Sequence, residues 1–213
     1  MKEIYLSKKS DGSMNEKENI DSFLTKKGIN PDEFSRGGLV HGKKVKIVTE
    51  KGAGEVMAKT DGLITADNIS LGVTVADCLP VYLYSKKFIG ILHAGWGGLE
   101  KEIIFEAVKK IKKIGERPKN INAYIGPSIQ VCHFEVKEDL VKKFSNYKNC
   151  FEKRDGKIFL NLQKIAKNQL NSHGIKNIKI SNKCTYCSQD LFSYRRDKEV
   201  NNMLAVITTN KNA

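Results

Sequence analysis

Five short apolar segments lie close together in the first half of the chain, and each has the composition of a β-strand. They are rich in β-branched and aromatic residues, and Gly, Asp and Lys residues separate them. The close spacing favours antiparallel or mixed pairing over a regular alternation of strands and helices. The segments are residues 45–49, 63–65, 71–75, 81–84 and 88–93.

Helical patterns flank this strand-rich region. Residues 16–27 place three large apolar side chains on one face and end at Gly28, and residues 99–114 carry an apolar stripe opposite a lysine-rich face. Two further helices are predicted at residues 137–144 and 162–172, and three further strands at residues 121–125, 175–180 and 203–208.

The order of these elements predicts an α+β fold with mixed sheets flanked by helices. The chain has 213 residues, of which 40% are hydrophobic, so it can bury one substantial core. No linker rich in proline or glycine divides it. We therefore expect a single domain over residues 1–213, with the segment before about residue 37 the least defined part.

A thiol and an imidazole follow two of the predicted strands. Cys78 stands in Ala76-Asp77-Cys78-Leu79-Pro80, and His93 opens His93-Ala94-Gly95-Trp96-Gly97-Gly98. Such a pair suits zinc or copper as ligands, and it can equally form a nucleophile and its base. The sequence predicts a cleft at these strand ends and leaves both chemistries open.

The chain contains four histidines, and one of them, His41, lies just before the predicted strand at residues 45–49. Three protein ligands with an open fourth position are typical of catalytic zinc. His41, Cys78 and His93 could supply such a triplet, although no compact local metal motif is present. Asp77, beside the cysteine, is interpreted either as an acid/base group or as a carboxylate that caps backbone N–H groups.

The chain is basic, with 37 Lys and Arg residues against 24 Asp and Glu residues and a formal net charge of +13. This charge is compatible with a nucleic-acid or anionic-substrate partner. The excess is mostly scattered lysine, and no RNA-module signature with interleaved aromatic residues occurs. We therefore expect no nucleic-acid partner, while the charge could help recruit phosphate.

The sequence shows no N-terminal secretory pattern and no apolar window of membrane-spanning length. Its five cysteines are an odd number, which favours reduced thiols. A cytoplasmic protein without a membrane partner is therefore expected. Cys184-x-x-Cys187 suggests redox chemistry or half of a structural zinc site, yet the sequence offers no second pair of this kind.

Several short motifs occur in a fixed order and together resemble a known family. The set resembles the polyphenol oxidase or laccase-domain family, whose members are zinc-dependent purine nucleoside phosphorylases. The motifs are Val40-His41-Gly42, Asp61-Gly62-Leu63-Ile64-Thr65, Ala76-Asp77-Cys78-Leu79-Pro80, His93-Ala94-Gly95-Trp96, Ile125-Gly126-Pro127-Ser128-Ile129, Cys184-Thr185 and Phe192-Ser193-Tyr194-Arg195-Arg196-Asp197.

The resemblance implies a zinc ion held by His41, Cys78 and His93. It also implies phosphorolysis of adenosine, inosine and S-methyl-5′-thioadenosine, with adenosine deamination as a companion activity. Arg195 and Arg196 are the candidate phosphate contacts because a guanidinium matches phosphate oxygens bidentately, and Lys43 is a weaker candidate.

The sequence departs from the family pattern at three places. Leu39 replaces the usual Gln, Gly97 stands where an Arg commonly follows His-Ala-Gly-Trp, and residues 199–203 lack the usual Thr-Gly-Arg. Two arginines that could contact phosphate or hold the loop are thus missing, which bears on the rate of phosphorolysis but leaves the three metal ligands in place.

The residues allow three other interpretations of the function to be considered. Four histidines are too few for the several copper centres of a multicopper laccase, although one copper ion could replace zinc in the triplet. A metal-free hydrolase or deamidase would use Cys78 as nucleophile and His93 as base. A non-catalytic nucleic-acid-binding module would instead use the positive charge.

Overall fold

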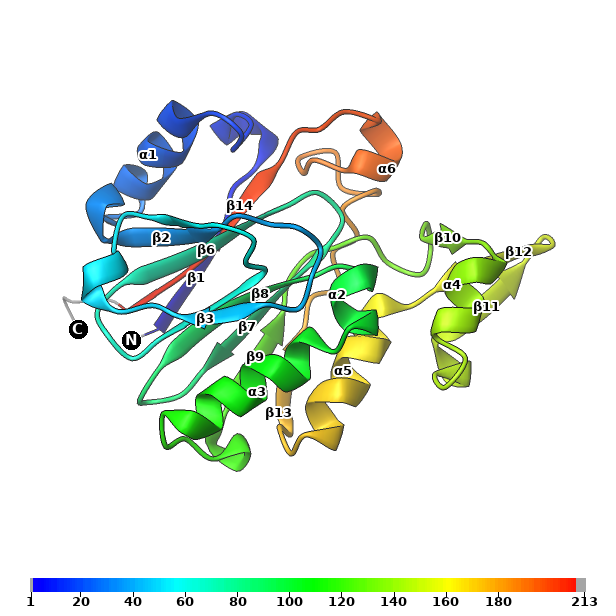
Figure 1. The fold of residues 1–213 in the computed structure, drawn as a ribbon. Coiled ribbons are helices and arrows are strands. Elements are labelled where there is room, and N and C mark those ends of the chain that lie inside the picture. Colours follow the sequence, from blue (N-terminus) through cyan, green and yellow to red (C-terminus); the bar gives the residue numbers. More distant parts are fainter. Residues whose placement is uncertain (1, 210–213) are drawn as a thin grey trace.

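Two mixed β-sheets form the centre of the computed structural model, which describes residues 2–209 (Figure 1). In the five-stranded sheet, β14 pairs antiparallel with β1 and β6, and β2 lies parallel to both β6 and β4. The strand order is β1 (Lys2–Leu6), β14 (Met203–Thr209), β6 (Ser70–Val75), β2 (Phe34–Gly37) and β4 (Val56–Met57).

The six-stranded sheet contains the two strands nearest the candidate site. An antiparallel pair, β7 and β8, lies in its middle, while β9 with β13 and β3 with β5 are parallel pairs. The order is β13 (Asn177–Ile180), β9 (Asn122–Ile125), β7 (Leu79–Tyr84), β8 (Ile89–Ala94), β5 (Gly62–Thr65) and β3 (Val45–Ile47).

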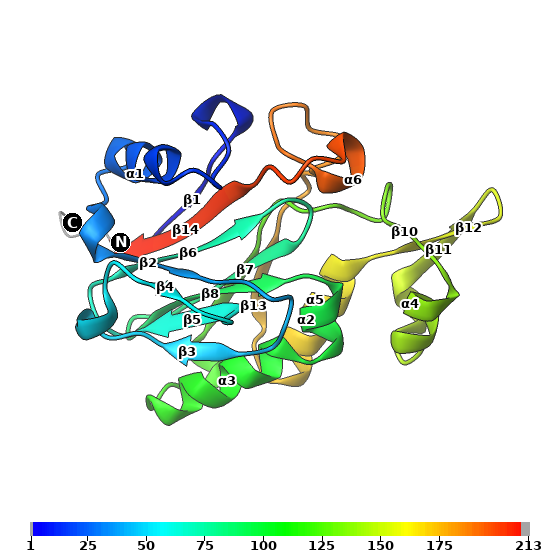
Figure 2. The ribbon, with the colours of Figure 1, turned by 45° about the horizontal axis from the view of Figure 1, so that its top comes forward.

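The two sheets pack on one another, and helices cover their outer faces (Figure 2). Apolar side chains of β6, β14, β7 and β8 fill the space between the sheets. Helix α1 (Lys17–Lys26) covers the five-stranded sheet, and α2 (Trp96–Glu100), α3 (Ile103–Lys113) and α5 (Leu162–Ser172) cover the six-stranded one. Burial on both faces explains why the central strands are continuous apolar runs rather than alternating ones.

Smaller elements lie beside this core. A three-stranded sheet projects from one end of it, with α4 alongside (Figure 1). This group consists of β10 (Glu135–Val136), β12 (Lys157–Leu160), β11 (Phe151–Arg154) and α4 (Glu138–Lys143), and helix α6 (Tyr194–Asp197) precedes β14. The 3-10 helices are η1 (Lys9–Asp11), η2 (Pro31–Glu33), η3 (Glu50–Gly52), η4 (Pro118–Asn120) and η5 (Lys148–Cys150).

The mixed α+β class predicted from the sequence is confirmed, and the predicted helix at residues 99–114 is the main error. Glu102 adopts a left-handed backbone conformation (φ 63°), so the segment divides into α2 and α3. The apolar stripe could not reveal this break because all five of its residues, from Ile103 to Ile111, belong to α3. The short strands β1, β2, β4, β10, β11 and β12 and helix α6 were not predicted.

Within residues 2–209, none of the helices combines the length and the apolar character needed to cross a bilayer.

Candidate functional site

Cys78 and His93 meet because β7 and β8 are neighbours. Cys78 directly precedes β7, and His93 is the penultimate residue of β8, opposite Pro80. Cys78 lies two residues before Pro80, so it is a diagonal neighbour of His93, and such diagonal neighbours are within reach of longer side chains. The thiol and the imidazole therefore meet at one end of the six-stranded sheet.

His41 reaches the same point from the loop between β2 and β3. Its backbone is left-handed (φ 53°), a conformation that is uncommon outside glycine and often found at functional sites. Asp61 holds this loop, since its carboxylate accepts the backbone N–H groups of Val40 at 3.2 Å and Gly42 at 2.9 Å. The imidazole ring of His41 lies edge-on to that of His93, with 4.8 Å between ring centroids.

Glycines make room for the three side chains. The ligand atoms of His41, Cys78 and His93 all lie within 4.8 Å of one another. A Cβ atom at Gly95 would stand 2.7 Å from the sulfur of Cys78, and one at Gly97 would stand 3.0 Å from the carbonyl oxygen of His41. These two glycines therefore permit the close approach of three side chains that could hold a metal ion.

Asp61 also orients His93 directly, a role that its sequence motif did not indicate. Its Oδ1 lies 3.2 Å from Nδ1 of His93, and both side chains are buried. With Nδ1 engaged, Nε2 of His93 is the atom left to bind a metal, which is the carboxylate–histidine arrangement common around metal ions. Asp61 begins a recognised motif, but nothing in its spacing identifies it as the partner of a histidine 32 residues away.

The metal-free site favours a thiolate beside an imidazolium. Burial would raise the pKa of the Cys78 thiol, but the charge of His93 and hydrogen bonds from His41 and His93 lower it to about 6. Burial would lower the pKa of His93, but the Cys78 thiolate and the Asp61 carboxylate raise it to about 9. A thiolate is both the metal-binding and the nucleophilic form of cysteine, so Cys78 is in the state that either chemistry requires.

Asp77 is bound on both carboxylate oxygens. The hydroxyl of Thr185 donates to Oδ1 at 2.6 Å, and the backbone N–H of Arg195 donates to Oδ2 at 2.7 Å. Its backbone has a positive φ of 86°, which turns the chain directly before Cys78. These contacts favour the interpretation of Asp77 as a carboxylate that caps backbone and hydroxyl donors, rather than as an acid/base group.

A cleft of about 570 Å³ opens over the three ligand atoms. Its size is typical of sites for small molecules. Asp77 and Arg195 are among its polar lining residues. Trp96 and Tyr194 are partly exposed, so their rings border the opening. The apolar and aromatic lining residues are Leu39, Ala76, Trp96, Ile129, Phe134, Tyr194 and Val200.

The two adjacent arginines have different surroundings. Arg195 lines the cleft, where its guanidinium donates to the carbonyl oxygen of Glu135 at 3.0 Å and lies 5.3 Å from the ring centre of Phe134. Lys43 is exposed and lies outside the set of described residues that line this cleft. The structure therefore brings Arg195 to the cleft but not Lys43.

Arg196 points away from the cleft into the chain that follows β13. Its guanidinium donates hydrogen bonds to backbone carbonyl oxygens and to the carboxylate of the next residue. The acceptors are Thr185, Tyr186, Ser188, Leu191 and Asp197, at 2.6–3.1 Å. Arg196 thus holds a loop together and has no donor directed at a ligand in the cleft.

Comparisons with known proteins agree with one another. The family described as "Multi-copper polyphenol oxidoreductase laccase" matches residues 6–210. A protein named purine nucleoside phosphorylase from Aquifex aeolicus is 41% identical over 148 residues, which is 69% of each chain. One of the same name from Deinococcus radiodurans is 31% identical over 210 residues, covering 96% of this chain and 81% of the other.

Solved structures share the fold. The crystal structure of hypothetical protein YfiH from Bacillus licheniformis superimposes with a TM-score of 0.84 at 29% identity. The match covers 91% of this chain and 80% of that one.

Proposed function

The chain belongs to the multi-copper polyphenol oxidoreductase laccase family, and from that membership we propose that it is a zinc-dependent purine nucleoside phosphorylase. The substrates are adenosine, inosine and S-methyl-5′-thioadenosine. A phosphate oxygen bonds to C1′ of the sugar as the bond from C1′ to the base breaks. The products are the free base, which takes up a proton, and ribose 1-phosphate or methylthioribose 1-phosphate.

One observation carries this proposal: the His41, Cys78 and His93 triplet lies at the cleft with aromatic walls and one arginine. The rings of Trp96, Phe134 and Tyr194 offer flat apolar surfaces for a purine. The Arg195 guanidinium offers donors for phosphate. A purine nucleoside and a phosphate ion need these two kinds of surface side by side.

The three side chains fit zinc better than a harder cation. One thiolate and two imidazoles are ligands that zinc and copper prefer, and three protein ligands leave a fourth position for substrate or water. The absence of a side chain at Gly95 keeps the space beside the Cys78 sulfur free. Bound there, zinc would polarise a substrate oxygen or nitrogen and lower the pKa of a coordinated water. Copper is proposed as a possible substitute because its affinity for such sites is higher.

The remaining residues position the reactants. Asp61 fixes the ring of His93 and the loop that carries His41. Asp77 fixes the backbone of Arg195 through its N–H group, so that the guanidinium stays at the cleft. We assign both carboxylates a positioning role, because their oxygens already accept hydrogen bonds from the chain.

We extend the proposal to hydrolytic deamination of adenosine at the same site. A metal at this site would supply an activated water for attack on C6 of the purine, the bond from C6 to the amino group would break, and ammonia would leave. The apolar walls would hold the base. Phosphorolysis and deamination are distinguished by their second substrate, since only the first consumes phosphate.

The test is to incubate zinc-replete protein with adenosine, with and without phosphate, and to separate the products by chromatography. Adenine is expected only with phosphate. Inosine is expected in both samples, and with phosphate part of it is expected to be converted to hypoxanthine. Cys78→Ala abolishes both products. The control is Cys150→Ala, which removes a buried thiol elsewhere in the core. Release of neither adenine nor inosine by the wild-type protein would refute the proposal.

The same material separates zinc chemistry from the metal-free hydrolase. Zinc in equal proportion to protein at this site, lost together with activity in His41→Ala, excludes a mechanism that needs only a Cys78 nucleophile and a His93 base. Activity that survives complete removal of metal would favour that mechanism instead.

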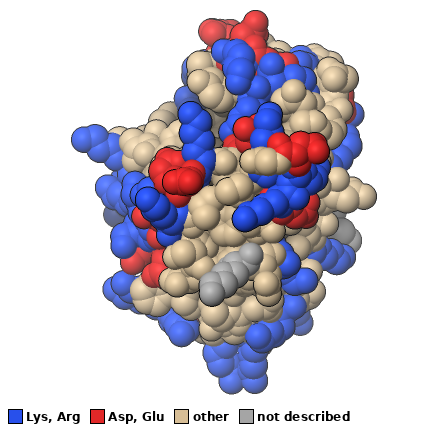
Figure 3. All heavy atoms as spheres, turned by 90° about the vertical axis from the view of Figure 1, so that its right-hand side faces the viewer, with Lys and Arg blue, Asp and Glu red and all other residues tan. Residues whose placement is uncertain are grey.

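We propose no nucleic-acid partner and a cytoplasmic location. On the face shown in Figure 3, basic side chains are interspersed with acidic ones rather than joined in a continuous stripe. The described cysteines are free thiols, as a reducing compartment would keep them.

A further inference from the structure

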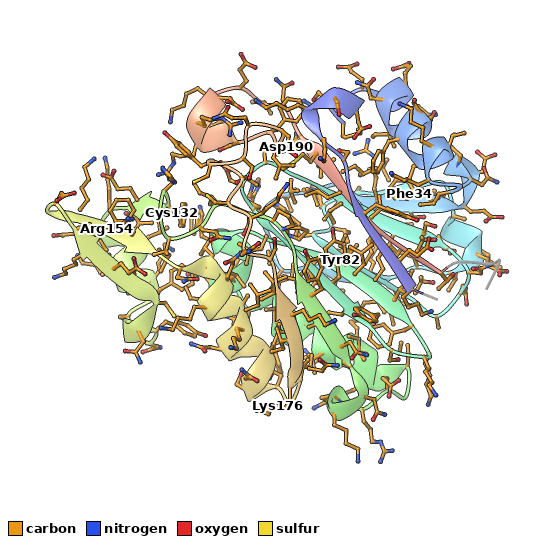
Figure 4. The ribbon with its side chains drawn as sticks, turned by 180° about the vertical axis from the view of Figure 1, so that it is seen from behind. Phe34, Tyr82, Cys132, Arg154, Lys176 and Asp190 are labelled. Atoms are coloured by element: carbon orange, nitrogen blue, oxygen red, sulfur yellow. The ribbon has the colours of Figure 1, made fainter. Side chains whose placement is uncertain are left out.

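A second cluster of metal-ligating side chains lies outside the residues that line the cleft. Cys132 and His133 belong to the turn that precedes β10, and Cys184 and Cys187 lie in the connection between β13 and α6. Figure 4 shows Cys132 where the projecting three-stranded sheet joins the body of the molecule, with Arg154 farther out. The fold thus brings together two pairs that are more than 50 residues apart in the chain.

The four side chains converge on one point. The Nδ1 atom of His133 lies 3.2 Å from the sulfur of Cys132 and 3.3 Å from that of Cys187, and these two sulfurs are 3.9 Å apart. With Cys184 included, all four ligand atoms lie within 4.8 Å of one another.

These separations match the edges of a tetrahedron around a single zinc ion. With the usual Zn–S and Zn–N bond lengths, sulfurs lie about 3.8 Å apart and a sulfur lies about 3.5 Å from a nitrogen. A disulfide would bring two sulfurs to about 2.05 Å, far closer than Cys132 and Cys187 lie here.

We propose that Cys132, His133, Cys184 and Cys187 bind one zinc ion as a structural site. Three thiolates and one imidazole fill all four positions, so no place is left for substrate or water. This zinc is distinct from the one proposed at His41, Cys78 and His93, and its presence does not depend on the phosphorylase activity. The Cys184-x-x-Cys187 motif is half of this site, and Cys132 with His133 is the other half.

The surrounding chain is already arranged for such a site. The backbone N–H of Gln130 points at the sulfur of Cys184 at 3.5 Å, a contact that stabilises a thiolate. The ring of His133 stacks on that of Tyr186, with 4.0 Å between centroids and 15° between planes, which fixes the imidazole with Nδ1 toward the sulfurs. Arg196 donates to the carbonyl oxygens of Thr185 and Tyr186, the two residues between Cys184 and Cys187.

The site is connected to the wall of the cleft on both sides. Phe134, which lines the cleft, directly follows His133. Thr185, which donates to Asp77 beside Cys78, directly follows Cys184. A zinc ion that joins the two segments therefore fixes the spacing between the aromatic wall and the floor of the cleft.

The first test measures zinc per chain by mass spectrometry of the metal in gel-filtered, zinc-replete protein. The wild type is expected to hold two zinc ions. Cys132→Ala combined with Cys187→Ala removes two ligands and is expected to leave one, as is His41→Ala, and all three substitutions together leave none. Cys150→Ala is the matched control and is expected to retain two.

A second measurement on the wild type alone guards against a variant that fails to fold. X-ray absorption at the zinc edge is expected to give an average of two sulfur ligands per zinc, since one site supplies three thiolates and the other supplies one. One zinc per chain with a single sulfur ligand would overturn the proposal, and so would a double cysteine variant that still holds two zinc ions. A disulfide between Cys132 and Cys187 in protein purified under reducing conditions would also overturn it.

Discussion

The Nδ1 atom of His93 and the Oδ1 atom of Asp61 lie 3.2 Å apart in a region where both side chains are buried. The same carboxylate accepts the backbone N–H groups on either side of His41. One buried aspartate therefore orients both histidines of the candidate metal centre, the first through its ring and the second through its backbone.

We expect Asp61→Asn to weaken zinc binding at the triplet by about 10–100-fold, because the amide carries no charge and matches these donors less well. Competition with a chromophoric chelator measures the affinity. Asp67→Asn is the control, since Asp67 also accepts a backbone N–H, from Glu50, at an exposed position. An Asp61→Asn protein with wild-type affinity would show that this hydrogen bond does not support the metal.

The affinity of the triplet for zinc is expected to rise with pH. Between pH values of about 6 and about 9, metal-free His93 holds a proton while Cys78 is a thiolate. Zinc must displace the His93 proton, so the affinity increases about tenfold per pH unit over this window. Below it, Cys78 is protonated too and the fall is steeper. Titrations at several pH values test this, and an affinity that stays constant between pH 7 and pH 9 would contradict it.

The folding stability of the metal-free protein responds differently to the same two groups. The raised pKa of His93 stabilises the fold at low pH and loses its effect toward about 9, whereas the lowered pKa of Cys78 begins to stabilise above about 6. The two contributions offset each other because folding moves a proton from the thiol to the imidazole. Urea unfolding of metal-free protein should therefore show little change from this pair between these pH values, and a steep slope that is absent from Cys78→Ala would disprove the pairing.

Gly95→Ala is expected to abolish zinc binding at the triplet, because the new Cβ would lie 2.7 Å from the Cys78 sulfur. The overpacking also destabilises the fold by about 1–3 kcal/mol. Gly52→Ala is a suitable control, since its Cβ would meet the flexible end of Met57 at 3.1 Å and make an ordinary contact with Val48 at 3.6 Å. Metal analysis and denaturant unfolding separate the two effects. Full zinc occupancy in Gly95→Ala would mean that the cysteine can move aside.

Substitutions of the two adjacent arginines are expected to have different effects. Arg195→Ala raises the KM for phosphate with a change in stability below about 1 kcal/mol, because its side chain lies at the cleft. Arg196→Ala lowers the free energy of unfolding by about 2–4 kcal/mol, because several loop carbonyls lose their donor. Kinetics and urea unfolding of both variants give the comparison. The reverse pattern would contradict the assignment of these two side chains.

Sequence patterns predicted the central strands because these strands bury whole apolar segments, and they predicted α5 because its apolar residues recur on one face. They did not predict β1 or β2, whose residues are partly polar and depend on pairing with distant strands. The role of Asp61 was missed for a related reason, and so was the approach of Cys132 and His133 to Cys184 and Cys187. Each of these contacts joins residues that are far apart in the chain, and local spacing carries no record of it.

The place of β14 in the five-stranded sheet affects how the chain can fold during its synthesis. β14 lies between β1 and β6, with Ile207 opposite Ile4 and Met203 opposite Val75, yet it is made last of the three. Until residue 209 has left the ribosome, β1 has no neighbour in the sheet, and α1 lacks Leu204 and Val206 to pack against. The nascent chain therefore carries unpaired edges and exposed apolar side chains through most of its translation, which is the period when it most needs protection from aggregation.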